Sequence, residues 1–194
     1  LKSHPLYGVS FASNELITDS PVSFAAIVSQ GFGQEVSSTI FNEKIRGTGM
    51  GEYEGVLNAP CTISIAKESG QAAATITYTN LVKMLARAWR PKMWLANQTT
   101  IVQLAQLAFV SGTQGVPFWM GDARNGIPAQ LLGLPIYFTE YCEAVGTVGD
   151  ILLCNWGEYL EGALEGVKRA ESMHVRSLEN ESTFRVTARN DGRC

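Results

Sequence analysis

The sequence predicts a mixed α+β fold, and two observations carry that prediction. Between Phe24 and Ile40, apolar residues recur every four positions, as on one face of a long helix. After Pro60, short segments rich in β-branched residues alternate with segments of helical periodicity. Hydrophobic residues make up 45% of the 194 residues, which is enough for the core of one domain or of two small ones.

A long helix is expected over about residues 21–45. Ser20 can cap its N-terminus, and Pro21 suits the first turn because the N–H that proline lacks would have no partner there. The apolar stripe consists of Phe24, Val28, Phe32, Val36 and Ile40. A single helix cannot bury such a stripe by itself, so we expect this one to lie along a sheet or another subunit.

The helix leads into a glycine-rich segment, Gly47-Thr48-Gly49-Met50-Gly51-Glu52-Tyr53-Glu54-Gly55. Such a segment raises the possibility of a nucleotide-binding loop. The dinucleotide fingerprint GxGxxG fails, however, because Glu52 or Glu54 stands where the third glycine belongs. The segment also follows a helix, so no helix N-terminus would face a phosphate, and the two acidic residues would repel one. The pattern therefore argues against nucleotide binding.

Farther along the chain, strands and helices alternate. Strands are expected over residues 62–65, 74–77, 93–96, 136–139 and 151–154. Asn80 can cap a helix over residues 81–89, which Pro91 closes, and another helix begins at Thr99 or Thr100 and runs through Phe109.

The composition excludes several classes of function. Charged residues are 17% of the chain, below the average of about 25% for soluble proteins, which is typical of a surface that meets other protein. A net charge of −3 without clustered Lys and Arg argues against a dedicated nucleic-acid binder. Four scattered cysteines and two histidines lack the spacing of a zinc site, so we expect no metal and no cofactor. No apolar stretch approaches the roughly 20 residues of a membrane-spanning helix.

An enzyme is an alternative with little support. The chain has no GxSxG, no HExxH and no phosphate-binding loop. Glu140 and Glu143 could form a carboxylate pair, but two carboxylates among 18 acidic residues are more often surface charges. We therefore predict no catalytic residues.

Several short motifs follow one another over nearly the whole chain. In order they are Leu16-Ile17-Thr18-Asp19-Ser20, Glu43 with Gly47-Thr48-Gly49-Met50-Gly51, Trp94-Leu95-Ala96-Asn97, Leu131-Leu132-Gly133-Leu134-Pro135, Gly149-Asp150-Ile151, and Phe184-Arg185 with Arg189-Asn190-Asp191-Gly192. No single motif is specific. Their order resembles that of the major capsid proteins of tailed bacteriophages with the Hong Kong 97-like fold.

The resemblance implies a particular domain arrangement. Residues 1–57 and 155–194 would form a peripheral domain with a long spine helix (residues 21–45) and an extended β-sheet, and residues 58–154 a mixed α/β axial domain. It implies sheet for residues 158–169, although their Glu, Leu, Ala and Lys content favours helix. The family's N-terminal arm and extended loop would lie upstream of Leu1, which makes the chain an N-terminally truncated piece.

The resemblance also implies a function. The chain would be a structural protein that self-assembles into hexamers and pentamers of an icosahedral shell enclosing a phage or prophage genome. Its partners would be further copies, packaged DNA without sequence-specific contact, and scaffold, protease and portal proteins. It would reside in the host bacterial cytoplasm before assembly and then in the virion capsid, with no membrane contact. An encapsulin-type nanocompartment shell is the main alternative.

Charged residues of both signs crowd the last segment of the chain. Arg185 and Arg189 are predicted to meet acidic groups of a neighbouring subunit, with Glu179 and Glu181 as further candidate inter-subunit contacts. The alternative is an ordinary solvated face, on which an ion pair contributes only about 0–1 kcal/mol.

Overall fold

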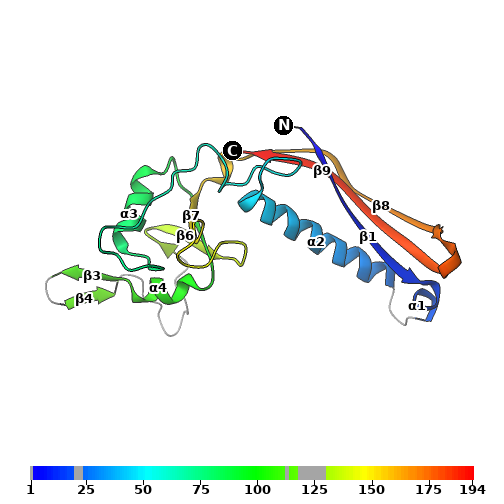
Figure 1. The fold of residues 1–194 in the computed structure, drawn as a ribbon, viewed down its shortest axis with the longest axis horizontal. Coiled ribbons are helices and arrows are strands. Elements are labelled where there is room, and N and C mark those ends of the chain that lie inside the picture. Colours follow the sequence, from blue (N-terminus) through cyan, green and yellow to red (C-terminus); the bar gives the residue numbers. More distant parts are fainter. Residues whose placement is uncertain (1, 20–23, 112–113, 118–129) are drawn as a thin grey trace. The chain divides into compact units, whose positions relative to one another are not determined.

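The chain divides into two compact units. Unit 1 comprises Leu1–Ala59 and Leu160–Cys194, and unit 2 comprises Pro60–Tyr159 (Figure 1). The computed structural model describes residues 2–19, 24–111, 114–117 and 130–194. The sequence placed the domain boundaries at 57/58 and 154/155.

Unit 1 is built on a three-stranded antiparallel sheet. β1 (His4–Ser13) pairs with the central strand β9 (Glu181–Arg193), which pairs on its other side with β8 (Leu160–Arg176). A short helix, α1 (Asn14–Asp19), follows β1, and the 3-10 turn η2 (Ser177–Glu179) joins β8 to β9. The sheet expected over residues 158–169 is therefore confirmed from Leu160 onward, because pairing with β9 outweighs the local helix propensity.

The long helix of unit 1 is α2 (Phe24–Arg46), which lies along the sheet (Figure 1). The predicted span is confirmed from Phe24, whereas the expected cap Ser20 and Pro21 lie outside the described residues. Its apolar stripe faces the sheet: the rings of Phe24 and Phe184 lie 6.1 Å apart. Near the middle of α2, Phe32 packs so closely on Gly8 that a Cβ there would lie 3.1 Å from the ring.

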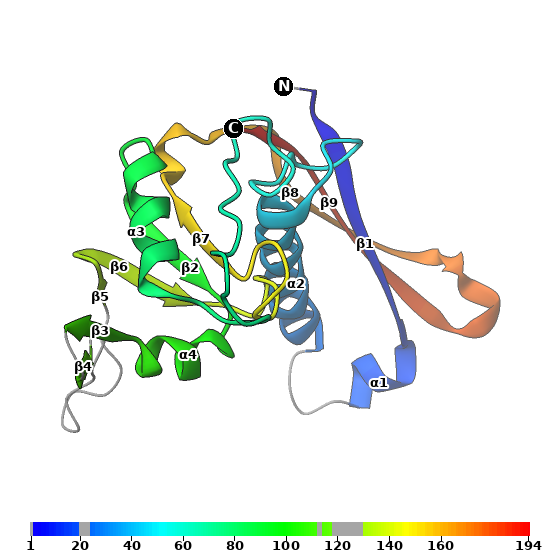
Figure 2. The same cartoon turned by 60° about the vertical axis from the view of Figure 1, so that its left-hand side comes forward.

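Unit 2 contains a four-stranded sheet in the order β5-β6-β2-β7 (Figure 2). The strands are β2 (Met93–Ala96), β5 (Gln130–Leu131), β6 (Leu134–Phe138) and β7 (Ile151–Cys154). β2 runs parallel to β6 and antiparallel to β7. The strands predicted at 93–96 and 151–154 are confirmed with these bounds, and the one predicted at 136–139 begins two residues earlier.

Two helices pack on this sheet and close the core of unit 2. They are α3 (Tyr78–Arg87) and α4 (Thr100–Gln106), and their residues Leu81 and Leu104 are fully buried beside Trp94. The Trp94 indole N–H donates a 2.9 Å hydrogen bond to the Leu131 carbonyl, so this buried polar group is satisfied. The hairpin β3 (Ala108–Ser111) and β4 (Gln114–Pro117) and the 3-10 turn η1 (Trp156–Glu158) complete the unit.

Three local predictions are wrong. Residues 62–65 and 74–77 are not strands, and the α4 helix ends at Gln106, not at Phe109, because the following residues form β3. Around 74–77, side-chain amides take the place of a neighbouring strand: the Ile76 N–H donates to Gln103 Oε1 at 2.9 Å, and Gln103 Nε2 donates to the Ala74 carbonyl at 2.8 Å. β-branched residues alone therefore do not make a strand where other groups satisfy the backbone.

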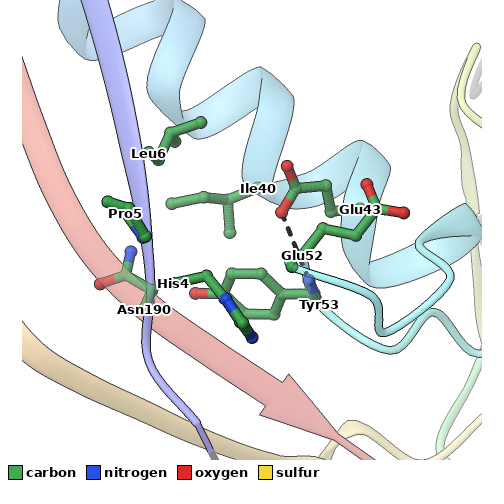
Figure 3. A pocket seen from close by; sticks show the side chains of 9 residues that line it. His4, Pro5, Leu6, Ile40, Glu43, Glu52, Tyr53 and Asn190 are labelled. Carbon is green, nitrogen blue, oxygen red and sulfur yellow. Dashed lines mark hydrogen bonds between the residues drawn. The ribbon is translucent and has the colours of Figure 1, made fainter.

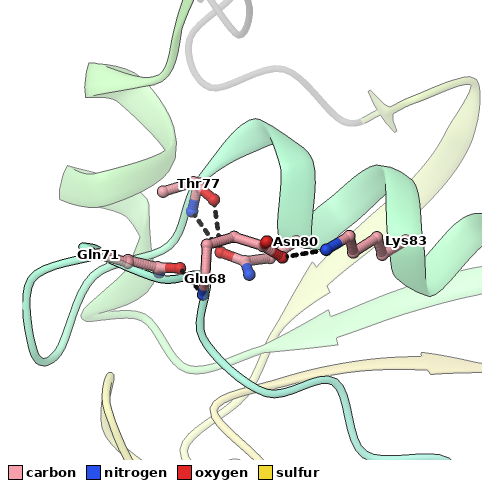
Figure 4. A network of polar contacts seen from close by, with 5 residues as sticks. All are labelled: Glu68, Gln71, Thr77, Asn80 and Lys83. Atoms are coloured by element: carbon pink, nitrogen blue, oxygen red, sulfur yellow. Dashed lines mark hydrogen bonds and ion pairs between the residues drawn. The ribbon is translucent and has the colours of Figure 1, made fainter.

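The start of α3 also differs from the prediction. Asn80 lies inside the first turn and is not the cap; Thr77 precedes the helix and donates to Asn80 Oδ1 from both its N–H, at 3.0 Å, and its hydroxyl, at 2.6 Å (Figure 4). In the same network Lys83 pairs with Glu68, which holds the preceding turn against the helix. The sequence correctly predicted that Asn80 marks the start of a helix, but the helix is capped by Thr77, three positions earlier.

Candidate subunit interface

The two faces of the unit 1 sheet differ in what covers them. On β9, Phe184, Val186 and Ala188 are buried on the face that packs on α2. Successive side chains of a strand point to opposite faces, so Arg185 and Arg189 lie on the other face, where both are exposed. The structure thus places these two predicted contact residues on one face of the middle strand, with Thr187 between them.

Exposed apolar side chains of β1 share that face. They are Tyr7, Val9 and Phe11, which stand opposite Thr187, Arg185 and Thr183 in the antiparallel register. Tyr7 is 70% exposed. We call the surface formed by Tyr7, Val9, Phe11, Arg185, Thr187 and Arg189 the open face. It combines an aromatic and aliphatic edge with two cations.

The predicted acidic contact residues lie elsewhere. Glu179 and Glu181 flank the turn between β8 and β9, and both pair with Arg176 Nη1, at 3.1 and 2.7 Å. Arg176 also lies over the Phe11 ring, 4.1 Å from its centroid. The hydrogen bond that Arg176 donates to Glu181 and the charges of both carboxylates raise the pKa of Arg176. Sequence reasoning missed Arg176, although an arginine three and five residues before two glutamates is a detectable signal.

The glycine-rich segment forms a tight loop at the end of α2. The Gly47 N–H donates to the Glu43 carbonyl at 2.7 Å, and the Gly55 N–H donates to the Gly47 carbonyl at 2.8 Å. A Cβ on Gly47 would lie 2.1 Å from the Tyr53 carbonyl oxygen, and one on Gly55 would lie 2.5 Å from the Gly47 nitrogen. These glycines therefore permit close backbone approach, which explains the segment without a phosphate ligand.

A shallow pocket lies between this loop, α2 and β1. Figure 3 shows Ile40 and Glu43 on α2, Glu52 and Tyr53 on the loop, and His4 of β1 and Asn190 of β9 lining the same pocket. Burial raises the pKa of Glu43, and the charge of Glu52 adds to this, although the Tyr53 N–H donates to the Glu43 carboxylate and acts in the opposite direction. Of the residues that the structure describes, no three of His, Cys, Asp or Glu converge to hold a metal ion.

A second carboxylate, that of Glu161, ties the glycine-rich loop to β8. Glu161 accepts hydrogen bonds from the Tyr53 hydroxyl at 3.0 Å and from Lys44 Nζ at 2.7 Å. Burial acts to raise the pKa of Glu161, but these two hydrogen bonds and the charge of Lys44 outweigh it and lower the pKa. The arrangement fixes the local structure of the loop, the end of α2 and the start of β8.

A family model described as the phage capsid family matches residues 1–194. The chain belongs to the phage capsid family. A comparison with curated proteins finds no match. None of the described helices is long and apolar enough to cross a membrane.

Solved capsid structures share the fold. The capsid of an empty GTA particle aligns with a TM-score of 0.79 at 16% sequence identity, over 98% of this chain and 69% of that chain. A Mycobacterium phage Adephagia chain aligns with a TM-score of 0.58 at 13% identity, over 97% of this chain and 64% of that chain. An encapsulin complex from Synechococcus elongatus aligns with a TM-score of 0.66 at 15% identity, over 98% of this chain and 69% of that chain.

These findings confirm the predicted Hong Kong 97-like α+β fold and the role of a capsid shell subunit. The capsid protein is a structural protein whose relatives form shells. A candidate functional site is accordingly a surface that could meet other subunits, and the open face is one described part of unit 1 with exposed apolar and charged side chains.

Proposed function

We propose that this capsid protein assembles through the open face, which binds acidic and apolar groups of neighbouring subunits in the pentamers and hexamers of an icosahedral shell. The observation that carries the proposal is the placement of the exposed Arg185 and Arg189 beside the exposed Tyr7 and Val9. Arginine and aromatic side chains are enriched at the positions that contribute most to binding in protein interfaces. A merely solvated face would not need the apolar neighbours.

Glu179 and Glu181 are weaker candidates for inter-subunit contacts than the two arginines. Both already pair with Arg176 of the same chain. A new contact would have to replace an existing ion pair, so its net contribution would be small. In this proposal the turn between β8 and β9 is held in shape by these pairs, and the arginines of the open face meet the neighbour.

Within such a shell, unit 1 would act as the peripheral domain and unit 2 as the axial domain. The shell would enclose a phage genome without sequence-specific contacts to the DNA, and its assembly would involve scaffold, protease and portal proteins. Subunits would reside in the host bacterial cytoplasm until they assemble. This role requires no catalysis, and we assign none.

Charge reversal tests the open face. In the full-length protein, Arg185→Glu or Arg189→Glu should raise the protein concentration needed for assembly at least tenfold, because repulsion replaces attraction at a desolvated contact. Closed shells are counted by negative-stain electron microscopy. Lys67→Glu makes the same charge change on an exposed residue of unit 2 and serves as the control. Normal assembly of both arginine variants, with unchanged thermal unfolding of the monomer, would leave the open face an ordinary solvated surface.

A nanocompartment shell is the second candidate, favoured by the structural likeness to the encapsulin complex. The contents of purified shells separate the two. Nuclease-protected DNA inside the shells supports the phage capsid, whereas a protein cargo without nucleic acid supports the nanocompartment.

A further inference from the structure

Charges of opposite sign are segregated along unit 2. Between Glu68 and Asp122 the sequence has no acidic residue and four basic ones, Lys83, Arg87, Arg90 and Lys92. From residue 125 to residue 167 it has no Lys or Arg, while Glu140, Glu143, Asp150 and Glu158 supply negative charge to unit 2. Each sign thus has its own part of the chain.

The topology places these two parts at opposite ends of the sheet. The basic segment runs along α3 and ends immediately before β2 begins at Met93 (Figure 2). β2 and β6 are parallel, and Glu140 and Glu143 follow the end of β6, where Asp150 precedes the antiparallel β7. The four residues of β2 separate the two ends by about 13 Å at roughly 3.3 Å per residue. Two acids of unit 2 lie with the basic segment: Glu158, which follows β7, and Glu68, which pairs with Lys83.

The basic end carries an exposed aromatic anchor. Trp89 is 75% exposed, and the Arg90 guanidinium lies 5.4 Å from the centre of its ring. Arg90 has a φ of 43°, an unfavourable conformation for a non-glycine residue and more so before Pro91. We call Arg87, Trp89 and Arg90 the tryptophan surface. Exposed tryptophan with arginine is the composition of interface positions that dominate binding energy.

The acidic end carries apolar side chains of its own. Tyr137 is 54% exposed and Val148 is 72% exposed, and Glu140 beside the end of β6 is exposed as well. In the register of β6, Ile136 lies in the core beneath α3, so Tyr137 points to the opposite face of the sheet. We call Tyr137, Glu140 and Val148 the acidic surface. It differs from the tryptophan surface in the sign of its charge. It also lies at the other end of the β2 and β6 strands and on the other face of the sheet.

We propose that the tryptophan surface of one copy binds the acidic surface of a second copy, so that unit 2 associates head to tail. The charges are complementary, and each surface contributes apolar area to the contact. Because the two surfaces are different and lie on different sides of the unit, the contact is heterologous, and such contacts close into rings when the rotation between copies permits. The inference rests on the proposed self-assembly and names a contact within a ring of subunits.

Cysteine cross-linking tests the pairing directly in the full-length protein. Exposed Cys61 and Cys194 are first replaced by serine. Arg87→Cys and Glu140→Cys are then made in separate chains and mixed under mild oxidation. Disulfide-linked dimers are expected in the mixture and in neither variant alone. Equal dimer formation by either variant alone, or no dimer in the mixture, would overturn the head-to-tail contact.

Charge exchange provides the second test. Arg90→Glu and Glu140→Arg should each weaken self-association at least tenfold, as measured by sedimentation velocity. The double variant should recover most of this loss because each contact again holds one charge of each sign.

Truncation of the tryptophan tests the apolar part of the contact. Trp89→Ala should weaken self-association about 30-fold, as expected for a dominant interface residue. Val102→Ala, which changes a similarly exposed apolar residue on α4, should have no effect.

The outcomes distinguish this contact from the open face and from DNA binding. If shells form normally and the unit 2 variants assemble like the wild type, the head-to-tail contact is wrong while the proposed function stands. If Arg90→Glu leaves association unchanged but lowers the amount of DNA retained, the tryptophan surface faces nucleic acid instead. A wild-type protein that stays monomeric at every concentration overturns both proposals.

Discussion

The Tyr53 hydroxyl donates a 3.0 Å hydrogen bond to Glu161 Oε1 and so joins the glycine-rich loop after α2 to the beginning of β8. The other carboxylate oxygen of Glu161 accepts from Lys44 Nζ, which also lies 5.8 Å from the centre of the Tyr53 ring. Tyr53 itself is buried. One carboxylate therefore ties the helix, the loop and the sheet of unit 1 together.

Tyr53→Phe tests this connection. The variant keeps the buried ring and removes the hydroxyl that donates to Glu161, so we expect the free energy of unfolding to fall by about 1 kcal/mol. Denaturant unfolding followed by circular dichroism measures the change. Tyr7→Phe is the control, because it makes the same chemical change on a ring that is largely exposed, and it should leave the free energy of unfolding unchanged. Equal effects of the two substitutions would mean that the hydrogen bond to Glu161 contributes nothing.

The raised pKa of Glu43 predicts a pH-dependent stability. Burial raises this pKa above its ordinary value of 4.5. The folded protein therefore holds the Glu43 proton more tightly than the unfolded chain does, and the resulting stabilisation, fully present below about pH 4.5, is lost as the pH rises through the raised pKa. Glu43→Gln keeps an acceptor for the Tyr53 N–H and removes the titration. The variant should be more stable than the wild type at pH 7.

The experiment compares the free energies of unfolding of both proteins between pH 4 and pH 8. The difference should shrink toward zero at the acidic end, where Glu43 is protonated in both states. Glu161 titrates in both proteins and its contribution cancels in the comparison. A constant difference across the whole range would show that Glu43 has no raised pKa.

The glycines of unit 1 predict opposite effects for the same substitution. Gly47→Ala would bring a Cβ to 2.1 Å from the Tyr53 carbonyl oxygen, so the loop must move, and we expect a loss of about 1–3 kcal/mol of stability. Gly31→Ala adds a methyl group to an exposed position of α2 where nothing lies within 4 Å, and should stabilise by about 0.5–1 kcal/mol. Thermal unfolding of the two variants should shift in opposite directions, and a shift in the same direction would contradict this account.

Local patterns in the sequence were sufficient where one physical signal dominates. The apolar stripe of α2, with one apolar residue every four positions, and the buried apolar runs of β2 and β7 each predicted an element that the structure contains. The segment around Ile76 failed because its backbone groups bond to the side chain of Gln103, 27 residues away. β8 required the family resemblance, since its composition favours helix and only its pairing with β9 makes it a strand.

The candidate interface shows the same limit. The exposure of Arg185 and Arg189 follows from strand alternation once β9 is placed. Their apolar neighbours on β1 could not be predicted, because the register joins residues more than 170 positions apart, as in the pairing of Val9 with Arg185. The pairing of Glu179 and Glu181 with Arg176 is local in sequence, but the position of Arg176 over Phe11 depends on that same register.

The core of unit 2 predicts a large effect for a single truncation. Leu81 of α3 is fully buried and packs with Trp94 and Leu104, so Leu81→Ala leaves a cavity between the helices and the sheet. We expect a loss of about 2–5 kcal/mol in the free energy of unfolding, measured by denaturant titration. Leu178→Ala, the same change at a fully exposed residue of unit 1, should alter the stability by less than about 0.5 kcal/mol.

Leu81 and Trp89 predict different effects within unit 2, because Leu81 lies in the core and Trp89 lies on the surface. Leu81→Ala should lower the unfolding temperature, whereas Trp89→Ala should weaken association and leave that temperature unchanged. A lowered unfolding temperature in both variants would mean that Trp89 contributes to the fold and not to an interface.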